Sequence, residues 1–313
     1  MKKILQQSLQ TWWLLVKLTV PALIAVRLMM WFGMVDLVSK PFEPLMTLIG
    51  LPKETALIWV TAMLTNNYTG IVVYLDLLPA MGPQTVLQAT VIGSVILIAH
   101  NLPVESGVCR GAGVSPLRMT ILRIIAALFY GFLINRIGLA FGLGQTQAQF
   151  IISFQTNPMP SWGAWLVGCF KSLIMIYLIA TFLLFMMAGF RKAGLLKVMT
   201  SILSPLLKLS GVGPKAAMIT IFGMLLGLAY GGGLIISEAR AGHVPKPDIF
   251  GSVTLMALCH SLVEDTLILG TLGGSFWGLL VGRLIFATVM TSLIVKGAHS
   301  NSLKSLVVGK KYF

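Results

Sequence analysis

Charged residues are scarce in this chain of 313 residues. Asp, Glu, Lys and Arg together make up 10% of it, and only nine residues are acidic. Soluble domains carry about 25% charged residues. Hydrophobic residues reach 57%, and apolar segments recur that approach the roughly 20 residues needed to span a bilayer. The composition therefore excludes an ordinary soluble domain and predicts an all-α polytopic membrane protein.

Several chemical signatures are also missing. The sequence has no GxxxxGK[ST] loop, which excludes a built-in nucleotide hydrolase of that type, and it has neither HExxH nor GxSxG. The three cysteines, Cys109, Cys169 and Cys259, form no CxxC pair, so neither a disulfide framework nor a thiolate metal site is indicated. We therefore expect no enzyme activity and no cofactor.

The net charge of +14 could indicate nucleic acid as a partner. The basic residues, however, lie in short loops beside apolar segments, where anionic lipid and membrane topology account for them. The expected partner is the lipid bilayer, with no nucleic acid.

The most informative feature present is an internal duplication. The seven residues His100–Ser106 match His260–Thr266, which lie 160 positions later. Each copy follows an apolar run and is followed at the same interval by an arginine, Arg123 or Arg283. Duplicated membrane halves with polar, broken segments at matching places are typical of secondary transporters.

The duplication and the basic residues together predict the topology. If two segments are re-entrant hairpins, fifteen basic residues lie inside and three outside, which satisfies the positive-inside rule. Each half then crosses three times, so the two repeats are inverted, with both termini cytoplasmic in a bacterial inner membrane. The expected spans are 11–34, 84–108, 117–138, 163–190, 249–271 and 276–297. The hairpins are 54–79 and 214–238, and amphipathic stretches cover 36–50 and 195–210.

These segments divide the chain into a first repeat (1–140), an external connecting loop (141–162), a second repeat (163–298) and a cytoplasmic basic tail (299–313). The sequence is also compatible with a homodimer. The hairpin midpoints, near Asn66–Gly70 and Gly227–Gly233, contain residues that turn easily. An alternative for the second midpoint is a helix-packing face, because Gly223, Gly227 and Gly231 have GxxxG spacing.

The polar residues of the duplicated segment lie at membrane depth. Thr85–Ala99 covers only about 22 Å as a helix, short of a hydrocarbon core of about 30 Å, so His100 lies within the membrane. Pro103 is expected to break the helix there. An unpaired carboxylate in hydrocarbon is costly, so such residues normally face a cavity. We therefore expect Glu105, Glu264 and Asp265 to bind a coupling ion or proton.

Structural pairing of these acids with Arg123 or Arg283 is the alternative. Asparagine, tyrosine and histidine side chains at the tips and breaks could bind a polar solute. The predicted substrate-binding residues are Asn66, Asn67, Tyr68, Thr69, His100, Asn101, Glu105, Tyr230, His260, Ser261, Glu264 and Asp265.

A metal site is a second reading of the same residues. His260 and Glu264 are four positions apart and would share one face of a helix, which is compatible with a metal that His100 also binds. Spacing alone does not separate a metal ligand from a proton relay or a hydrogen bond to substrate.

Three segments of the second half, Gly211–Met218, Gly227–Glu238 and His260–Asp265, resemble the nucleoside-recognition, or Gate, domain family. The first half matches more loosely at Leu51–Asp76 and His100–Glu105. Related Gate units occur in concentrative nucleoside transporters and bacterial ferrous-iron transporters. The resemblance implies hairpin and broken-helix repeats that hold solute between hairpin tips and unwound helices. The chain lacks the extra scaffold helices and the GTP-binding domain of those transporters.

These observations favour a secondary transporter for a small polar solute, such as a nucleoside, nucleobase or similar metabolite, coupled to H⁺ or Na⁺. One alternative is a divalent-metal permease that uses the His, Glu and Asp cluster. Another is a non-transporting membrane scaffold or assembly partner.

Overall fold

The computed structural model describes residues 2–150 and 161–299, and within these ranges the chain is helical with no β-strand. Four stretches are apolar and long enough to cross a membrane, and a pair of helices bent by 109° would make a fifth. The protein is therefore an all-α membrane protein, as its composition predicted. The four stretches are Val86–Gly111, Pro116–Ala140, Trp162–Ile179 and Trp277–Gly297.

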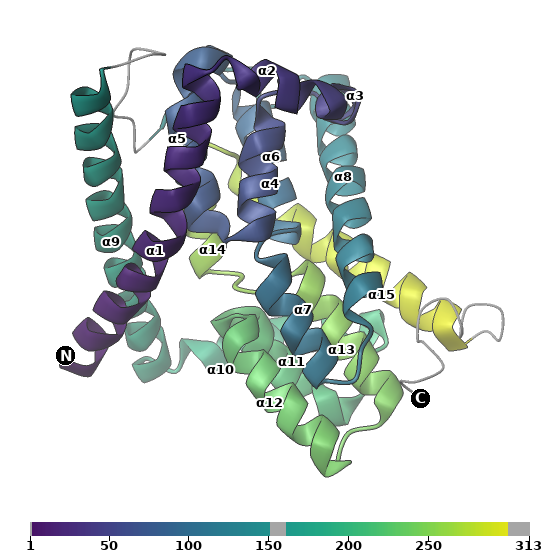
Figure 1. The fold of residues 1–313 in the computed structure, drawn as a ribbon. Helices are drawn as coiled ribbons and strands as arrows, with labels where there is room; N and C mark the ends of the chain where they lie inside the picture. Colours follow the sequence, from purple (N-terminus) through teal and green to yellow (C-terminus); the bar gives the residue numbers. More distant parts are fainter. Residues whose placement is uncertain (1, 151–160, 300–313) are drawn as a thin grey trace.

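The first half consists of a long helix, short helices at one end of the molecule, a helical hairpin, a broken helix and a final long helix (Figure 1). These elements are α1 (Lys2–Trp31), α2 (Met34–Ser39), η1 (Lys40–Phe42), α3 (Glu43–Leu48), α4 (Thr55–Leu64), α5 (Asn67–Met81), α6 (Val86–Ile98), α7 (Leu102–Gly111) and α8 (Pro116–Ala140).

The second half repeats that order of elements. They are α9 (Trp162–Lys192), α10 (Leu195–Ser210), α11 (Pro214–Leu226), α12 (Leu228–Ala241), α13 (Lys246–Leu258), α14 (Glu264–Gly270), the π-helical turn η2 (Trp277–Gly282) and α15 (Arg283–His299). In Figure 1, α2 and α3 lie at the top and α10 lies in the lower half, while α6 lies above α7 and α13 below α14. An inverted relation between the halves requires this opposite order.

By length and composition, the described residues contain four candidate spans, or five with the bent pair, where six crossings were predicted. The segment 249–271 is a broken helix, as the duplicated polar segment predicted, because Cys259–Val263 separates α13, of 13 residues, from α14, of seven. At 1.5 Å per residue, α13 alone covers about 20 Å, too short for a crossing. The first predicted span, 11–34, corresponds to most of α1, and the bent segment α2–α3 follows it at an angle of 109°.

Both predicted hairpins consist of two short helices that pack against each other, α4 with α5 and α11 with α12. The ten residues of α4 reach only about 15 Å, half the thickness of a hydrocarbon core. At the first tip, Asn66 caps α5, since its Oδ1 accepts a hydrogen bond of 2.9 Å from the backbone N–H of Thr69. An asparagine cap therefore starts the returning helix.

The glycines of the second hairpin serve both roles that the sequence left open. A Cβ added at Gly231 would lie 2.2 Å from the Cα of Gly223, so the α11 and α12 backbones pack too closely for a larger residue. Gly227 forms the turn itself with a φ of +92°, and a Cβ there would lie 2.7 Å from Ser261 Oγ. The tip thus lies directly against the second helix break.

Candidate functional site

The two helix breaks have the same backbone geometry. Asn101 and Ser261, which follow the two histidines at equivalent positions, have φ values of 50° and 46°. They are the two non-glycine residues with positive φ in the described part of the chain. Such a conformation is uncommon outside glycine, and its recurrence at repeat-related positions shows that both copies break in the same way.

Each break is also held by its own hairpin. The N–H of Asn101 donates to the carbonyl of Ala62 in α4 (2.9 Å), and the N–H of Leu262 donates to the carbonyl of Met224 in α11 (2.8 Å). A lipid environment offers no partner to a freed backbone N–H, so the hairpins supply one.

Both histidine rings are oriented by the helix that they terminate. His100 Nδ1 lies 2.9 Å from the carbonyl oxygen of Ile96, and His260 Nδ1 lies 2.8 Å from that of Met256. A carbonyl oxygen can only accept, so each Nδ1 carries the proton and donates it. Each Nε2 is then free to face the centre between the breaks, where the ring centroids lie 5.1 Å apart.

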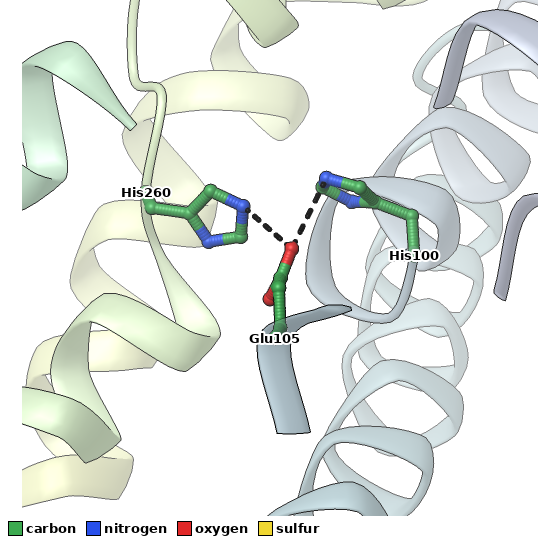
Figure 2. Close-up of side chains that lie close together, drawn as sticks. All are labelled: His100, Glu105 and His260. Atoms are coloured by element: carbon green, nitrogen blue, oxygen red, sulfur yellow. Dashed lines mark ion pairs between the residues drawn. The ribbon is translucent and has the colours of Figure 1, made fainter. Parts of the chain in front are cut away.

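Two carboxylates complete this centre. Glu105 Oε1 lies 3.3 Å from His260 Nε2 and 3.7 Å from His100 Nε2 (Figure 2). Asp265 Oδ2 lies 3.6 Å from His100 Nε2. Glu105 and Asp265 are themselves 160 positions apart, and all four residues are 3–6% exposed. Each copy therefore contributes one histidine and one carboxylate to a buried cluster, here called the His–carboxylate centre.

The two repeat-related arginines have different partners. Arg123 forms an ion pair with Glu105 and also donates to the carbonyls of Ile98 (2.8 Å) and His100 (3.0 Å), so it fixes both the acid and the end of α6. Arg283 instead donates to Thr266 Oγ1 at 3.2 Å, and it makes no ion pair with a carboxylate of the described residues. The predicted pairing thus holds for Arg123 alone.

The position of Glu264 does not agree with the predicted metal site, in which it shares a helix face with His260. Its Oε1 accepts a hydrogen bond of 2.7 Å from the Tyr68 hydroxyl on the first hairpin. Glu264 is the first residue of α14, and the residues from His260 to Val263 are not helical, so His260 and Glu264 share no helix face. Among the described residues, the group able to hold a metal is His100, His260 and Glu105.

The remaining predicted residues divide between the hairpin tips and the turns. Thr69 Oγ1 contacts Asn66 Oδ1 (3.2 Å) and Thr19 of α1 (2.8 Å), so Asn66 and Thr69 hold the tip together. Asn67 is buried, its Oδ1 accepts a hydrogen bond of 3.0 Å from the N–H of Tyr68, and its side chain lies beside Asp265. Asn101 and Ser261 form the turns. Tyr230 lies in α12, but its side chain is outside the described residues.

The sequence reasoning missed a second buried polar group. Trp165 Nε1 donates to Asp76 Oδ1 at 3.0 Å, and the Arg27 guanidinium lies 5.3 Å from the centroid of Trp162 and 5.8 Å from that of Trp165. This group joins α1, α5 and α9. Asp76 and Arg27 each lie inside an apolar run of the sequence, and charged residues at such positions could have indicated this group.

A surface hollow of about 880 Å³ also lies away from the His–carboxylate centre. Residues of α3, α6 and α8 line it, among them Glu43, Gln88 and Asn135. None of the four residues of the centre belongs to it. The buried centre and this hollow are therefore separate features.

The chain is similar to the uncharacterized membrane protein YvoD of Bacillus subtilis (strain 168), with 29% identity over 99% of each chain. No family model matches the chain, and no solved structure matches it significantly. The relative is described as a membrane protein and nothing further, so the resemblance to the Gate family stays a prediction.

Proposed function

We propose that this protein is a secondary transporter of the bacterial inner membrane whose cargo passes the His–carboxylate centre. One observation carries the proposal. Each repeat copy contributes one histidine and one carboxylate to a buried cluster. In this cluster the distances between histidine Nε2 atoms and carboxylate oxygens are 3.3–3.7 Å. Ionisable residues at such a position in a membrane protein normally mark an ion, proton or substrate path.

The surrounding architecture supports this proposal. Broken helices and hairpins in matched halves place irregular backbone around a central site, as in transporters built from inverted repeats. The copies also exchange contacts: α5 of the first hairpin reaches α14 through Tyr68 and Glu264, and α12 of the second packs on α7. A movement of one copy relative to the other would break these contacts and open the centre to one side.

Two classes of cargo agree with a buried polar centre. A nucleoside, nucleobase or similar solute, coupled to H⁺ or Na⁺, would use the Tyr68 hydroxyl and the Asn67 amide as hydrogen-bonding groups. A divalent cation would use the histidines and carboxylates directly.

A scaffold without transport activity is the competing function, and it assigns the buried acids no role beyond packing. The discriminating experiment is uptake into proteoliposomes that contain purified protein. Labelled uridine and adenosine, and separately Zn²⁺ and Mn²⁺, serve as probes.

We expect the wild type to take up at least one probe and Glu105→Gln to lose most of that flux. Glu238→Gln is the matched control, because Glu238 pairs with the exposed His243 (3.0 Å) away from the centre. No protein-dependent uptake of any probe would favour the scaffold. Protein-dependent uptake that Glu105→Gln leaves unchanged would instead contradict passage of the cargo through the His–carboxylate centre.

A further inference from the structure

The His–carboxylate centre brings together atoms that repel one another unless a proton or a metal ion lies among them. Both Nδ1 atoms donate to backbone carbonyls, so each neutral ring directs the lone pair of Nε2 toward Glu105 Oε1, and His100 also faces Asp265 Oδ2. Arg123 neutralises Glu105 through Oε2, on the other side of the carboxylate. The inward-facing atoms are therefore all acceptors, inside a region that excludes bulk water.

Three of the separations are close to those of ligands around one metal ion. Nitrogen and oxygen ligands about 2.0–2.1 Å from a tetrahedral ion lie about 3.4 Å from each other. The observed separations are 3.3 Å and 3.7 Å from Glu105 Oε1 to the two Nε2 atoms, and 3.6 Å from His100 Nε2 to Asp265 Oδ2. Figure 2 shows the Glu105 carboxylate between the two imidazole rings.

The groups behind these atoms have the form of an outer ligand shell. Histidines that bind metal usually donate their second ring N–H to a carbonyl or carboxylate, and binding carboxylates are themselves hydrogen-bonded. Ile96 and Met256 supply the two carbonyls, and Arg123 supplies the partner of the carboxylate. Protonation of both rings instead would place two more cations 5.1 Å apart, beside Arg123.

We infer that His100, His260 and Glu105 bind one divalent first-row transition-metal ion, with Asp265 adjacent as a fourth ligand. Two imidazole nitrogens and a carboxylate suit ions of the Mn²⁺ to Zn²⁺ series, whereas Mg²⁺ and Ca²⁺ select oxygen ligands. The ligands belong to both copies, so separation of the copies removes a histidine from the ion and releases it. The claim that the ion is the cargo rests on the proposed function, but its binding does not.

The test is equilibrium binding of Zn²⁺ to the full chain, purified in detergent with an affinity tag that contains no histidine and stripped of metal with a chelator. One Zn²⁺ per chain is expected, with weaker competition by Mn²⁺ and none by Mg²⁺. His260→Gln and Glu105→Gln should each weaken binding by about tenfold or more, and Arg123→Lys by about 10–100-fold through loss of the outer-shell contacts.

The matched control is His243→Ala, which removes a histidine whose side chain is 71% exposed and should leave Zn²⁺ affinity unchanged. Thermal unfolding and gel filtration verify that each variant is folded. A folded wild type that binds no Zn²⁺ overturns the inference, and so does binding that survives both His260→Gln and Glu105→Gln.

Uptake into proteoliposomes separates this inference from the proposed function. Zn²⁺ flux that disappears in His260→Gln supports both. Zn²⁺ binding without Zn²⁺ or nucleoside flux keeps the metal site and refutes transport. Nucleoside flux without Zn²⁺ binding keeps the transporter and refutes the metal site.

Discussion

Among single residues, Arg123 is the one whose loss the centre should tolerate least. It is 2% exposed, and its removal in Arg123→Gln leaves the Glu105 carboxylate without its ion-pair partner in a buried site. Breaking a buried ion pair on one side costs about 3–5 kcal/mol. We therefore expect a clear fall in the midpoint of thermal unfolding, measured in detergent.

The internal control is Arg283→Gln at the equivalent position of the second copy. Arg283 donates to the neutral Thr266 hydroxyl, so its substitution leaves no unpaired carboxylate and should lower the midpoint less. A larger fall for Arg283→Gln than for Arg123→Gln would contradict the role assigned to the ion pair.

The sequence identified the residues of the centre but not all of their partners. His100, His260, Glu105 and Asp265 stood out as scarce polar residues in duplicated apolar segments, and the structure brings them together. Glu264 was placed with the histidines by helical spacing. That spacing does not apply, because Ser261 takes a left-handed conformation and the helix restarts only at Glu264.

Among the elements, the second hairpin depends on the turn at Gly227. Its φ of 92° and ψ of 162° belong to a region that essentially only glycine adopts, and such backbone strain costs about 1–3 kcal/mol for other residues. Gly227→Ala also directs a methyl group at Ser261 Oγ, 2.7 Å away. We expect this substitution to lower the unfolding midpoint and to disturb the second break.

Gly233→Ala provides the comparison within the same helix, α12. A Cβ at Gly233 has nothing within 4 Å, and alanine favours a helix over glycine by about 1 kcal/mol, so stability should stay equal or rise. Equal unfolding midpoints for Gly227→Ala and Gly233→Ala would contradict the requirement for glycine at the turn of the second hairpin.

Hairpins and breaks were predictable because their causes are local. The asparagines at the first tip, the glycines at the second and Pro103 at the first break all act within a few residues. The interruption of the 249–271 segment has no proline, and the Leu262 N–H there bonds to Met224, 38 positions earlier in the chain. A bond between distant segments is not visible in a window of sequence, so the repeated polar segment predicted this break but not the partner that holds it.

At the scale of the whole molecule, each hairpin contacts the broken helix of the other copy. A Cβ at Gly232 in α12 would lie 3.4 Å from the Cβ of Val108 in α7, close to the separation of about 3.5–4.5 Å found in disulfides. In a chain whose three native cysteines are replaced, Val108→Cys with Gly232→Cys should form a disulfide under mild oxidation. Mass spectrometry of the linked peptides detects it.

The paired control is Val108→Cys with Gly233→Cys, because none of the described residues lies within 4 Å of a Cβ at Gly233. Equal cross-linking of the two pairs would contradict the packing of α12 on α7. If the copies move relative to each other during transport, the Val108–Gly232 cross-link should also stop uptake, and a reducing agent should restore it.

The most direct measurement of the central claim is an anomalous difference map at the zinc edge, from crystals of the full chain grown with Zn²⁺. A single peak within about 2.0–2.2 Å of both Nε2 atoms and Glu105 Oε1 is the expected result. A map without a peak there, with the two histidines hydrogen-bonded directly to Glu105 and Asp265, would contradict a cation site shared by the two copies.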